Sequence, residues 1–208
     1  DQLVAKGWRG EGAAFRCDST GNWPVYRLYN TSSGEHFYTS SKAEYDAVGA
    51  VRGWSKEGEA FRGSGCLCLD VAADQATDGV NVQLGVFSAD LSQQWVVSTR
   101  EDGTRQLQNR QTGKVLDMSR GAKAGNNVQQ WRDTDSRDQR WDLPLLGMQA
   151  TINGTPYDLC RIVAHANQQA CVDTMRDAAG ANALLATPGG DPSQRWAFVP
   201  VQALHSGG

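Results

Sequence analysis

Short alternating runs of apolar and polar residues recur along the chain, and no long amphipathic helical pattern stands out. Val25 to Asn30 alternates as a strand does, a Ser-Ser-Gly turn follows at residues 32–34, and His36 to Thr39 predicts a second strand. Ser41 to Val48 then predicts a short helix with Ser41 as its cap. The 23 glycines and 7 tryptophans favour many short strands joined by turns, so a mostly β protein is expected.

The N-terminal stretch contains a repeated motif, Gly-Trp-x-x-Glu-Gly-x-Ala-Phe, at residues 7–15 and again 46 residues later at 53–61. With Tyr-Arg-Leu-Tyr-Asn at 26–30 and His-Phe-Tyr-Thr at 36–39, this unit resembles an uncharacterised repeat of secreted bacterial proteins. We therefore expect a small α+β repeat domain of unknown function over residues 1–62. Its aromatic residues are interpreted as the core of this domain, with a sugar-stacking surface as the alternative: Trp23, Tyr26, Tyr29, Phe37 and Tyr38.

A different repeat occupies the rest of the chain. Gln-x-Trp occurs three times, ending at Trp95, Trp141 and Trp196, and each copy closes a segment opened by Leu-Asp or Val-Asp. The Asp-to-Trp separations are 25, 24 and 23 residues, whereas the tryptophans recur after 46 and 55 residues. A nearly constant internal interval with variable gaps indicates three structural repeats with loop insertions between them.

Three ordered Gln-x-Trp copies resemble the ricin-type β-trefoil lectins, a family of carbohydrate-binding modules, over residues 63–201, with residues 202–208 as a tail. The resemblance implies that three lobes pack about an axis and close a barrel, because one lobe of this size cannot bury its own apolar face. It also implies that the three motif tryptophans belong to the hydrophobic core and do not contact sugar.

The middle lobe holds every part that the resemblance implies for a sugar site. An ionised carboxylate accepts hydrogen bonds from vicinal hydroxyls, amides fill the remaining positions, and an aromatic ring covers the C–H face of a pyranose. Where the family has Asn, this lobe has Asp138, which accepts but cannot donate. The expected sugar-binding residues are Asp117, Gln129, Trp131, Asp138 and Gln139.

The other two lobes lack parts of this set. The first has Gly85 where the ring is expected and Ser92 in place of the amide, so a weaker second site is expected at Asp70, Gln83, Phe87 and Gln93. In the third lobe Asp173 and Asn182 remain, but Leu184 and Ala186 replace the amide and the ring, and this lobe is interpreted as structural.

The five cysteines form no Cys-x-x-Cys pair and do not cluster with the three histidines, so neither a metal site nor a cofactor is expected. Cys160 and Cys171 flank a polar segment and are expected to form a disulfide, and Cys17 is expected to pair with Cys66 or Cys68. Bridges of this kind indicate a secreted or cell-surface protein. Five reduced, mostly buried thiols are the alternative.

Composition and charge narrow the classes of function. The net charge of −3, without a basic stripe, argues against nucleic acid as a partner, and no run of about 18 apolar residues exists to insert into a membrane.

Non-catalytic binding of galactose or N-acetylgalactosamine glycans is the leading prediction. A module that targets xylan or another polysaccharide for a linked catalytic domain, and a protein-interaction module, are the alternatives. Catalysis by Asp117 and Asp138 is disfavoured because neither acid sits in an evident apolar pocket that would raise its pKa.

Overall fold

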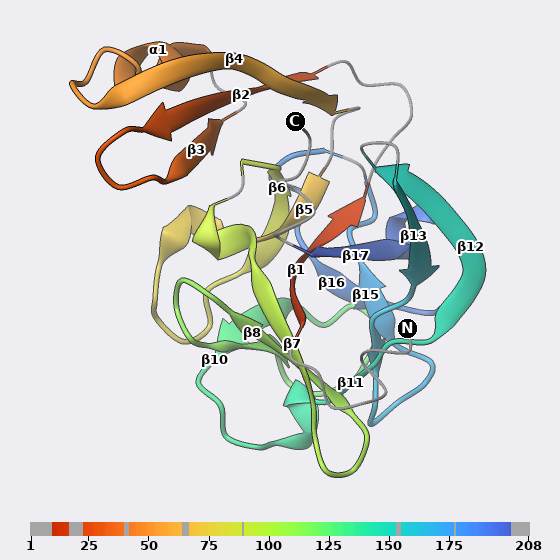
Figure 1. The fold of residues 1–208 in the computed structure, drawn as a ribbon. Helices are drawn as coiled ribbons and strands as arrows, with labels where there is room; N and C mark the ends of the chain where they lie inside the picture. The colour runs from red at the N-terminus through yellow and green to blue at the C-terminus, as the bar shows by residue number, and fades with distance from the viewer. Residues whose placement is uncertain are drawn as a thin grey trace.

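A computed structural model of the chain describes residues 10–16, 23–39, 42–63, 67–88, 90–152, 155–176 and 178–200. These residues form a fourteen-stranded sheet, a three-stranded sheet and one short α-helix (Figure 1). The prediction of a mostly β protein with one short helix is confirmed. The expected helix cap Ser41 and the C-terminal tail lie outside the described residues.

The small sheet contains β2 (Trp23–Asn30), β3 (His36–Thr39) and β4 (Trp54–Gly63) in the order β3-β2-β4, with α1 (Lys42–Val48) packed on one face. The ring centroids of Tyr26 and Tyr45 lie 4.8 Å apart between the sheet and the helix, and Leu28 is fully buried on the same face. This pattern explains the core of the small domain. Tyr38 is also buried, whereas Tyr29 keeps part of its surface, and the side chain of Trp23 lies outside the description.

The strand β1 (Gly10–Arg16) belongs to a different sheet from the one that the predicted domain boundary implies. It lies within residues 1–62, yet its backbone pairs with β17 (Trp196–Pro200), β7 (Trp95–Thr99) and β5 (Leu67–Val71) of the large sheet. A strand at this place satisfies backbone groups that β17 and β7 would otherwise expose at an edge. The small domain of the structure is therefore β2, β3, α1 and β4, inserted between β1 and β5 (Figure 1).

Three hairpins mark the three lobes of the large sheet. They pair β5 with β6 (Val82–Val86), β9 (Val115–Met118) with β10 (Val128–Trp131), and β15 (Cys171–Asp173) with β16 (Leu184–Ala186). The registers are equivalent, because Asp70 lies opposite Gln83, Asp117 opposite Gln129, and Asp173 opposite Leu184. The remaining strands are β8 (Arg105–Asn109), β11 (Trp141–Asp142), β12 (Leu145–Ile152), β13 (Thr155–Cys160) and β14 (Val163–Ala164).

Isolated bridges join the three hairpins to one another. They link Asn81 with Gln129, Asn127 with Leu184, and Gln83 with Asn182, so each hairpin contacts both others. Beneath them lies one hydrophobic core in which Trp95, Trp141 and Trp196 are fully buried. The prediction that the three motif tryptophans are core residues is confirmed.

The expected disulfide between Cys160 and Cys171 is absent from the structure. Both thiols are free and buried, as is that of Cys68. Cys160 pairs through its backbone with Trp196 on β17, and Cys171 pairs with Ala186 on β16, so the polar segment between the cysteines does not bring them together as a simple hairpin would. Cys17 and Cys66 lie outside the described residues, so their expected pairing stays a prediction.

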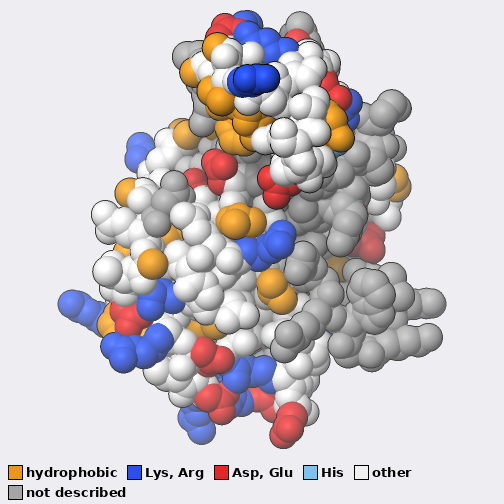
Figure 2. Space-filling view, turned by 60° about the vertical axis from the view of Figure 1, so that its left-hand side comes forward, with side chains coloured by type: hydrophobic (Ala, Val, Ile, Leu, Met, Phe, Trp, Pro, Cys, Tyr) orange, Lys and Arg blue, Asp and Glu red, His pale blue; other side chains and the backbone are white. Residues whose placement is uncertain are grey.

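The surface carries both signs of charge. On the face drawn in Figure 2, Lys and Arg side chains alternate with Asp and Glu side chains and form no large patch of one sign. Within the described part of the chain, no helix has the length and apolar character to cross a membrane.

Candidate functional site

The glutamine of each Gln-x-Trp motif makes the same three hydrogen bonds in its lobe. It ends a short 3-10 turn, donates to the lobe's aspartate and to a backbone carbonyl seven residues upstream, and accepts from the backbone N–H five residues upstream. Gln139 donates to Asp117 Oδ2 at 3.0 Å and to the Arg132 carbonyl at 2.8 Å, and accepts from Thr134 N at 2.9 Å. The same three contacts recur at Gln93 and Gln194.

The tryptophan of each motif is anchored in an equivalent way. Its indole Nε1 donates to the carbonyl that precedes the lobe's aspartate, at 3.0 Å for Trp95 and Trp141 and 3.4 Å for Trp196. A buried indole N–H needs such a partner, so this bond fixes the ring against the strand that carries the aspartate. The repeated motif is therefore the frame that positions each aspartate.

In the middle lobe both carboxylate oxygens of Asp117 accept from amides. Gln129 Nε2 donates to Oδ1 at 2.9 Å and Gln139 Nε2 donates to Oδ2 at 3.0 Å. Gln129 lies directly opposite Asp117 across the β9–β10 pair, which explains the first contact. Two fixed donors hold the carboxylate in one orientation and leave further lone pairs as acceptors.

Trp131 lies beside this carboxylate on β10. Because side chains alternate along a strand, Val128 and Gln130 point into the core, while Gln129 and Trp131 remain partly exposed on the other face. The Trp131 ring lies against the backbone of Gly79 from the first lobe, where an added Cβ would be 3.4 Å from the ring. An aromatic face and a fixed carboxylate thus share one side of the middle hairpin.

Asp138 lies one residue before Gln139 on the 3-10 turn and is partly exposed next to Gly121, where an added Cβ would be 3.8 Å from its Oδ1. Burial raises the pKa of Asp117, the amides of Gln129 and Gln139 oppose this, and the carboxylates of Asp138 and Asp78 add to the rise. This corrects the expectation that the pKa of Asp117 is not raised, since the sequence gives no sign of how deeply the loops bury it.

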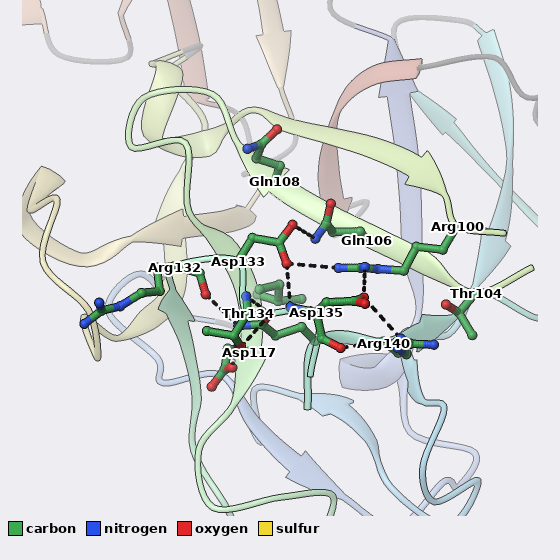
Figure 3. Close-up of polar contacts among 12 residues, drawn as sticks. Arg100, Thr104, Gln106, Gln108, Asp117, Arg132, Asp133, Thr134, Asp135 and Arg140 are labelled. Atoms are coloured by element: carbon green, nitrogen blue, oxygen red, sulfur yellow. Dashed lines mark hydrogen bonds and ion pairs between the residues drawn. The ribbon is translucent and has the colours of Figure 1, made fainter. Parts of the chain in front are cut away.

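The loop from Arg132 to Ser136, which bounds the site, is fixed by ion pairs from neighbouring strands (Figure 3). Arg100 contacts Asp133 at 3.2 Å and also pairs with Asp135, while Gln106 Nε2 donates to Asp133 at 2.8 Å. Arg140 contacts Asp135 at 3.1 Å. In Figure 3 Asp133 and Asp135 point toward Arg100, and Arg132 points away from them.

Asp78 connects the first lobe to the site. Its carboxylate contacts Lys114 Nζ at 2.5 Å and Arg132 Nε at 2.6 Å, and also accepts from the Arg132 backbone N–H at 2.9 Å. The hydrogen bond from Lys114 and those from Arg132 lower the pKa of Asp78 to about 2. The loop that precedes β6 is therefore attached to the end of β10 directly after Trp131.

The first lobe has no equivalent ring. Asp70 lies over Gly85, where an added Cβ would be only 2.3 Å from Asp70 Oδ2, so the carboxylate occupies the space that a side chain at residue 85 needs. Phe87, predicted to substitute for the ring, is 3% exposed and presents no face to solvent. Phe87 therefore does not provide the exposed ring that was expected for the weaker second site. Gln83 remains partly exposed opposite Asp70.

The third-lobe aspartate is held by its motif glutamine in the same way as that of the middle lobe. Asp173 is buried and accepts from Gln194 Nε2 at 2.9 Å and from the Met175 backbone N–H at 2.7 Å. Burial alone would raise the pKa of Asp173, but these hydrogen bonds outweigh it and the pKa is lowered. Leu184 and Ala186 lie in the register positions that Gln129 and Trp131 fill in the middle lobe, so this lobe has neither amide nor ring.

Comparison with known proteins agrees with the three-lobed geometry. The family described as ricin-type beta-trefoil lectin domain-like matches residues 60–131 and 91–184. The chain belongs to this family. A domain of unknown function, DUF5648, matches residues 1–69, which agrees with the resemblance of the N-terminal unit to an uncharacterised repeat. A search of the curated proteins found no match.

Solved structures show the same fold. A designed threefold-symmetric protein, ThreeFoil, is 23% identical with a TM-score of 0.58, and the match covers 85% of this chain and 99% of that one. The Rhizoctonia solani agglutinin is 14% identical with a TM-score of 0.55, covering 89% of this chain and 99% of that one. The exo-β-1,3-galactanase of Clostridium thermocellum is 16% identical with a TM-score of 0.58, but the match spans 88% of this chain and 32% of that one. The large sheet is thus a β-trefoil, as predicted.

Membership of the ricin-type lectin family indicates carbohydrate binding, and the trefoil's geometry refines the predicted residues. Asp117, Gln129 and Trp131 lie together, and Asp138 lies on the neighbouring turn, but Gln139 is fully buried. All its polar groups are used inside the lobe, so it orients Asp117 and does not face a ligand.

Two residues that support the site, Gln130 and Asp78, were not predicted from the sequence. Gln130, next to the predicted Gln129, is fully buried and donates to the carbonyls of Gln75 at 2.6 Å and Thr77 at 3.1 Å, which ties the first-lobe loop to β10. The alternation of inward and outward side chains along β10 could have identified Gln130. It turns this residue inward, where an amide must find hydrogen-bond partners. No comparable signal marks Asp78, whose partners are 36 and 54 residues away.

Proposed function

We propose that the middle lobe of this β-trefoil binds a galactose-type pyranoside, such as a galactose, N-acetylgalactosamine or lactose-like terminus, without catalysing a reaction on it. The observation that carries the proposal is the Asp117 carboxylate, which two amides hold in one orientation beside the partly exposed Trp131. Galactosides are the first choice because they present an aliphatic face and a rim of vicinal hydroxyls, which match a ring and a carboxylate.

Three of the four proposed contacts come from partly exposed side chains, and the fourth, Asp117, keeps 7% of its surface exposed. Trp131 covers the C–H face, Asp117 accepts from two hydroxyls through its remaining lone pairs, and the partly exposed Gln129 and Asp138 reach the hydroxyls at the rim. Asp138 offers acceptors only, so it favours a hydroxyl over a carbonyl or an anionic group at its position. The adjoining loop from Arg132 to Ser136 is already fixed by Arg100 and Arg140, which lowers the cost of ordering it on binding.

A single shallow site of this kind should bind a monosaccharide with a dissociation constant of about 1 mM, roughly −4 kcal/mol. Retention on a surface then requires several sites or a linked partner. A covalently linked catalytic domain, with this chain as its targeting module, fits that requirement.

Calorimetric titration of galactose, N-acetylgalactosamine and lactose into the wild type, Trp131→Ala and Asp117→Asn tests the proposal. One-site binding should be lost in both variants. The pair Gln129→Ala and Gln83→Ala provides the matched control, because the two glutamines occupy the same register position in different lobes, and only the first should weaken binding.

The remaining functions correspond to other outcomes. Binding to xylan or another polysaccharide, but not to galactosides, would indicate a different targeting module. Capture of a purified protein without retention of any glycan would indicate an interaction module. Release of a sugar product from a galactoside, abolished by Asp138→Asn, would indicate an enzyme with Asp117 and Asp138 as its acids.

A further inference from the structure

Five side chains of the small N-terminal domain lie together on the face of the β3-β2-β4 sheet that is opposite α1. We call them the Arg27 cluster: Arg27, Tyr29, His36, Tyr38 and Glu57. All five belong to the three sequence motifs of this domain, which are Tyr-Arg-Leu-Tyr-Asn, His-Phe-Tyr-Thr and Gly-Trp-Ser-Lys-Glu-Gly. The trefoil's proposed site uses none of them.

Strand register places these residues on one face. Arg27 lies opposite Tyr38 and Tyr29 opposite His36, whereas the alternating residue Tyr26 points to α1, where it meets Tyr45. The Tyr29 and His36 ring centroids are 5.0 Å apart, and those of His36 and Tyr38 are 6.3 Å apart. The face away from the helix therefore carries a row of three rings.

A bulge in β4 directs Glu57 toward this row. Lys56 pairs with Leu28 and Gly58 pairs with Arg27, which leaves Glu57 as an extra residue between them. Gly58 has a φ of +89°, a conformation that favours glycine, and this explains why the motif has Gly after Glu. Bulges of this kind redirect side chains and are frequent beside functional sites.

Glu57 is held by two partners. Its Oε2 lies 2.6 Å from Arg27 Nε and 3.3 Å from His36 Nε2, and the three side chains keep 30%, 25% and 32% of their surface exposed. Partly exposed ion pairs add little to stability, about 0–1 kcal/mol, although Tyr38 on the same face is buried. Stabilisation of the sheet therefore accounts for Tyr38 but not for the partly exposed Arg27, His36 and Glu57.

We propose that the Arg27 cluster is a second carbohydrate-binding site, which takes a neutral oligosaccharide. The rings of Tyr29 and His36 offer a surface for the C–H face of a pyranose, Glu57 accepts from its hydroxyls, and Arg27 donates. The opposite charges of Arg27 and Glu57 cancel, so an anionic ligand gains no net attraction from this pair. The proposal is independent of the middle-lobe site, and two sites on one chain would increase retention on a polysaccharide.

The experiment is an NMR titration of the full chain carrying Trp131→Ala, which disables the proposed middle-lobe site. The probes are tetrasaccharides of β-linked galactose, N-acetylglucosamine, xylose and glucose, each at about 10 mM, roughly tenfold above a millimolar dissociation constant. At least one should shift the ring resonances of His36, and Tyr29→Ala should weaken that binding about tenfold through loss of ring contact.

Glu57→Gln keeps the shape of the side chain but removes its charge, and it should also weaken the response. Asp46→Asn is its matched control, because Asp46 is likewise paired with two cations, Lys42 and Lys56, but through another part of the domain. Absence of any His36 shift with all four sugars, shifts that persist unchanged in Glu57→Gln, or a response to inorganic phosphate in place of the sugars would each overturn the proposal. Because these readouts come from the Trp131→Ala background, they do not depend on whether the middle lobe binds galactosides.

Discussion

Gln139 donates a hydrogen bond to Asp117 Oδ2 at 3.0 Å while keeping none of its own surface exposed. The same side chain holds the Arg132 carbonyl and the Thr134 N–H, so one buried amide joins the loop, the turn and the carboxylate. The middle lobe's candidate site is thus supported from behind by the residue that most strongly marks the repeat in the sequence.

Gln139→Ala should lower the free energy of unfolding by about 3 kcal/mol, because it leaves buried donors and acceptors without partners. Urea denaturation measures the change. Gln108→Ala is the matched control, since Gln108 is exposed and its side chain donates to the Gly113 carbonyl at 2.8 Å, so the substitution should cost less than about 0.5 kcal/mol. Equal effects of the two substitutions would contradict the role assigned to Gln139.

Acid should weaken the attachment between the first and middle lobes. The hydrogen bonds from Lys114 and Arg132 lower the pKa of Asp78 to about 2, below its unfolded value of about 3.9. A depressed carboxyl pKa contributes stability that is present above the unfolded value and is lost as the pH falls through the folded value.

Denaturation midpoints between about pH 5 and pH 2 should therefore fall more steeply in the wild type than in Asp78→Asn, across the interval set by the unfolded and folded pKa values. Urea titrations at several pH values measure this difference. Parallel curves for the two proteins would show that Asp78 has no net coupling to folding.

Restoring a ring to the first lobe at residue 85 should fail. Even Gly85→Ala places a Cβ 2.3 Å from Asp70 Oδ2, so it should destabilise the fold by about 1–3 kcal/mol through displacement of that carboxylate. Gly190→Ala is the control, because an added Cβ there meets nothing within 4 Å. A thermal melt compares them, and a Gly85→Ala protein as stable as Gly190→Ala would mean that Asp70 moves aside at no cost.

The thiols of Cys160 and Cys171 should resist alkylation in the folded protein. Burial raises the pKa of Cys160 to about 12, and burial is also the main cause that raises the pKa of Cys171 to about 11. Both should be alkylated by iodoacetamide once the chain is unfolded in guanidinium without a reductant, as mass spectrometry of the peptides would show. Labelling that requires a reductant would instead demonstrate a disulfide and contradict the free thiols of the structure.

The sequence predicts the frame of the trefoil better than the function of each residue in it. Trp95, Trp141 and Trp196 recur after nearly constant intervals from an aspartate, and because a repeated interval reflects repeated packing, their burial could be predicted. The sequence also names Asp117 and Gln129 for one site, and the structure pairs them directly across β9 and β10.

The burial of a side chain and its pairing with residues far along the chain are harder to predict, because both depend on where the backbone of other lobes passes. Gln139 was assigned to the ligand, but it is enclosed by its own loop, and Phe87 is covered although its spacing suited a surface ring. Asp78 meets Lys114 and Arg132 only because two lobes lie side by side. The pairing of β1 with the large sheet likewise has no local signal, since its sequence nearly repeats that of β4 in the small sheet.

The pairing of β1 with β5 has a consequence for how this protein can diversify. Phe15 lies opposite Cys68 and Arg16 opposite Leu67, so the chain leaves the barrel and re-enters it at adjacent positions. An insertion whose two ends are already close imposes little strain on its host, which is why domains are tolerated at such points. Recombination could therefore replace the unit formed by β2, β3, α1 and β4 with another of different recognition properties, while the three lobes and their contacts stay as they are.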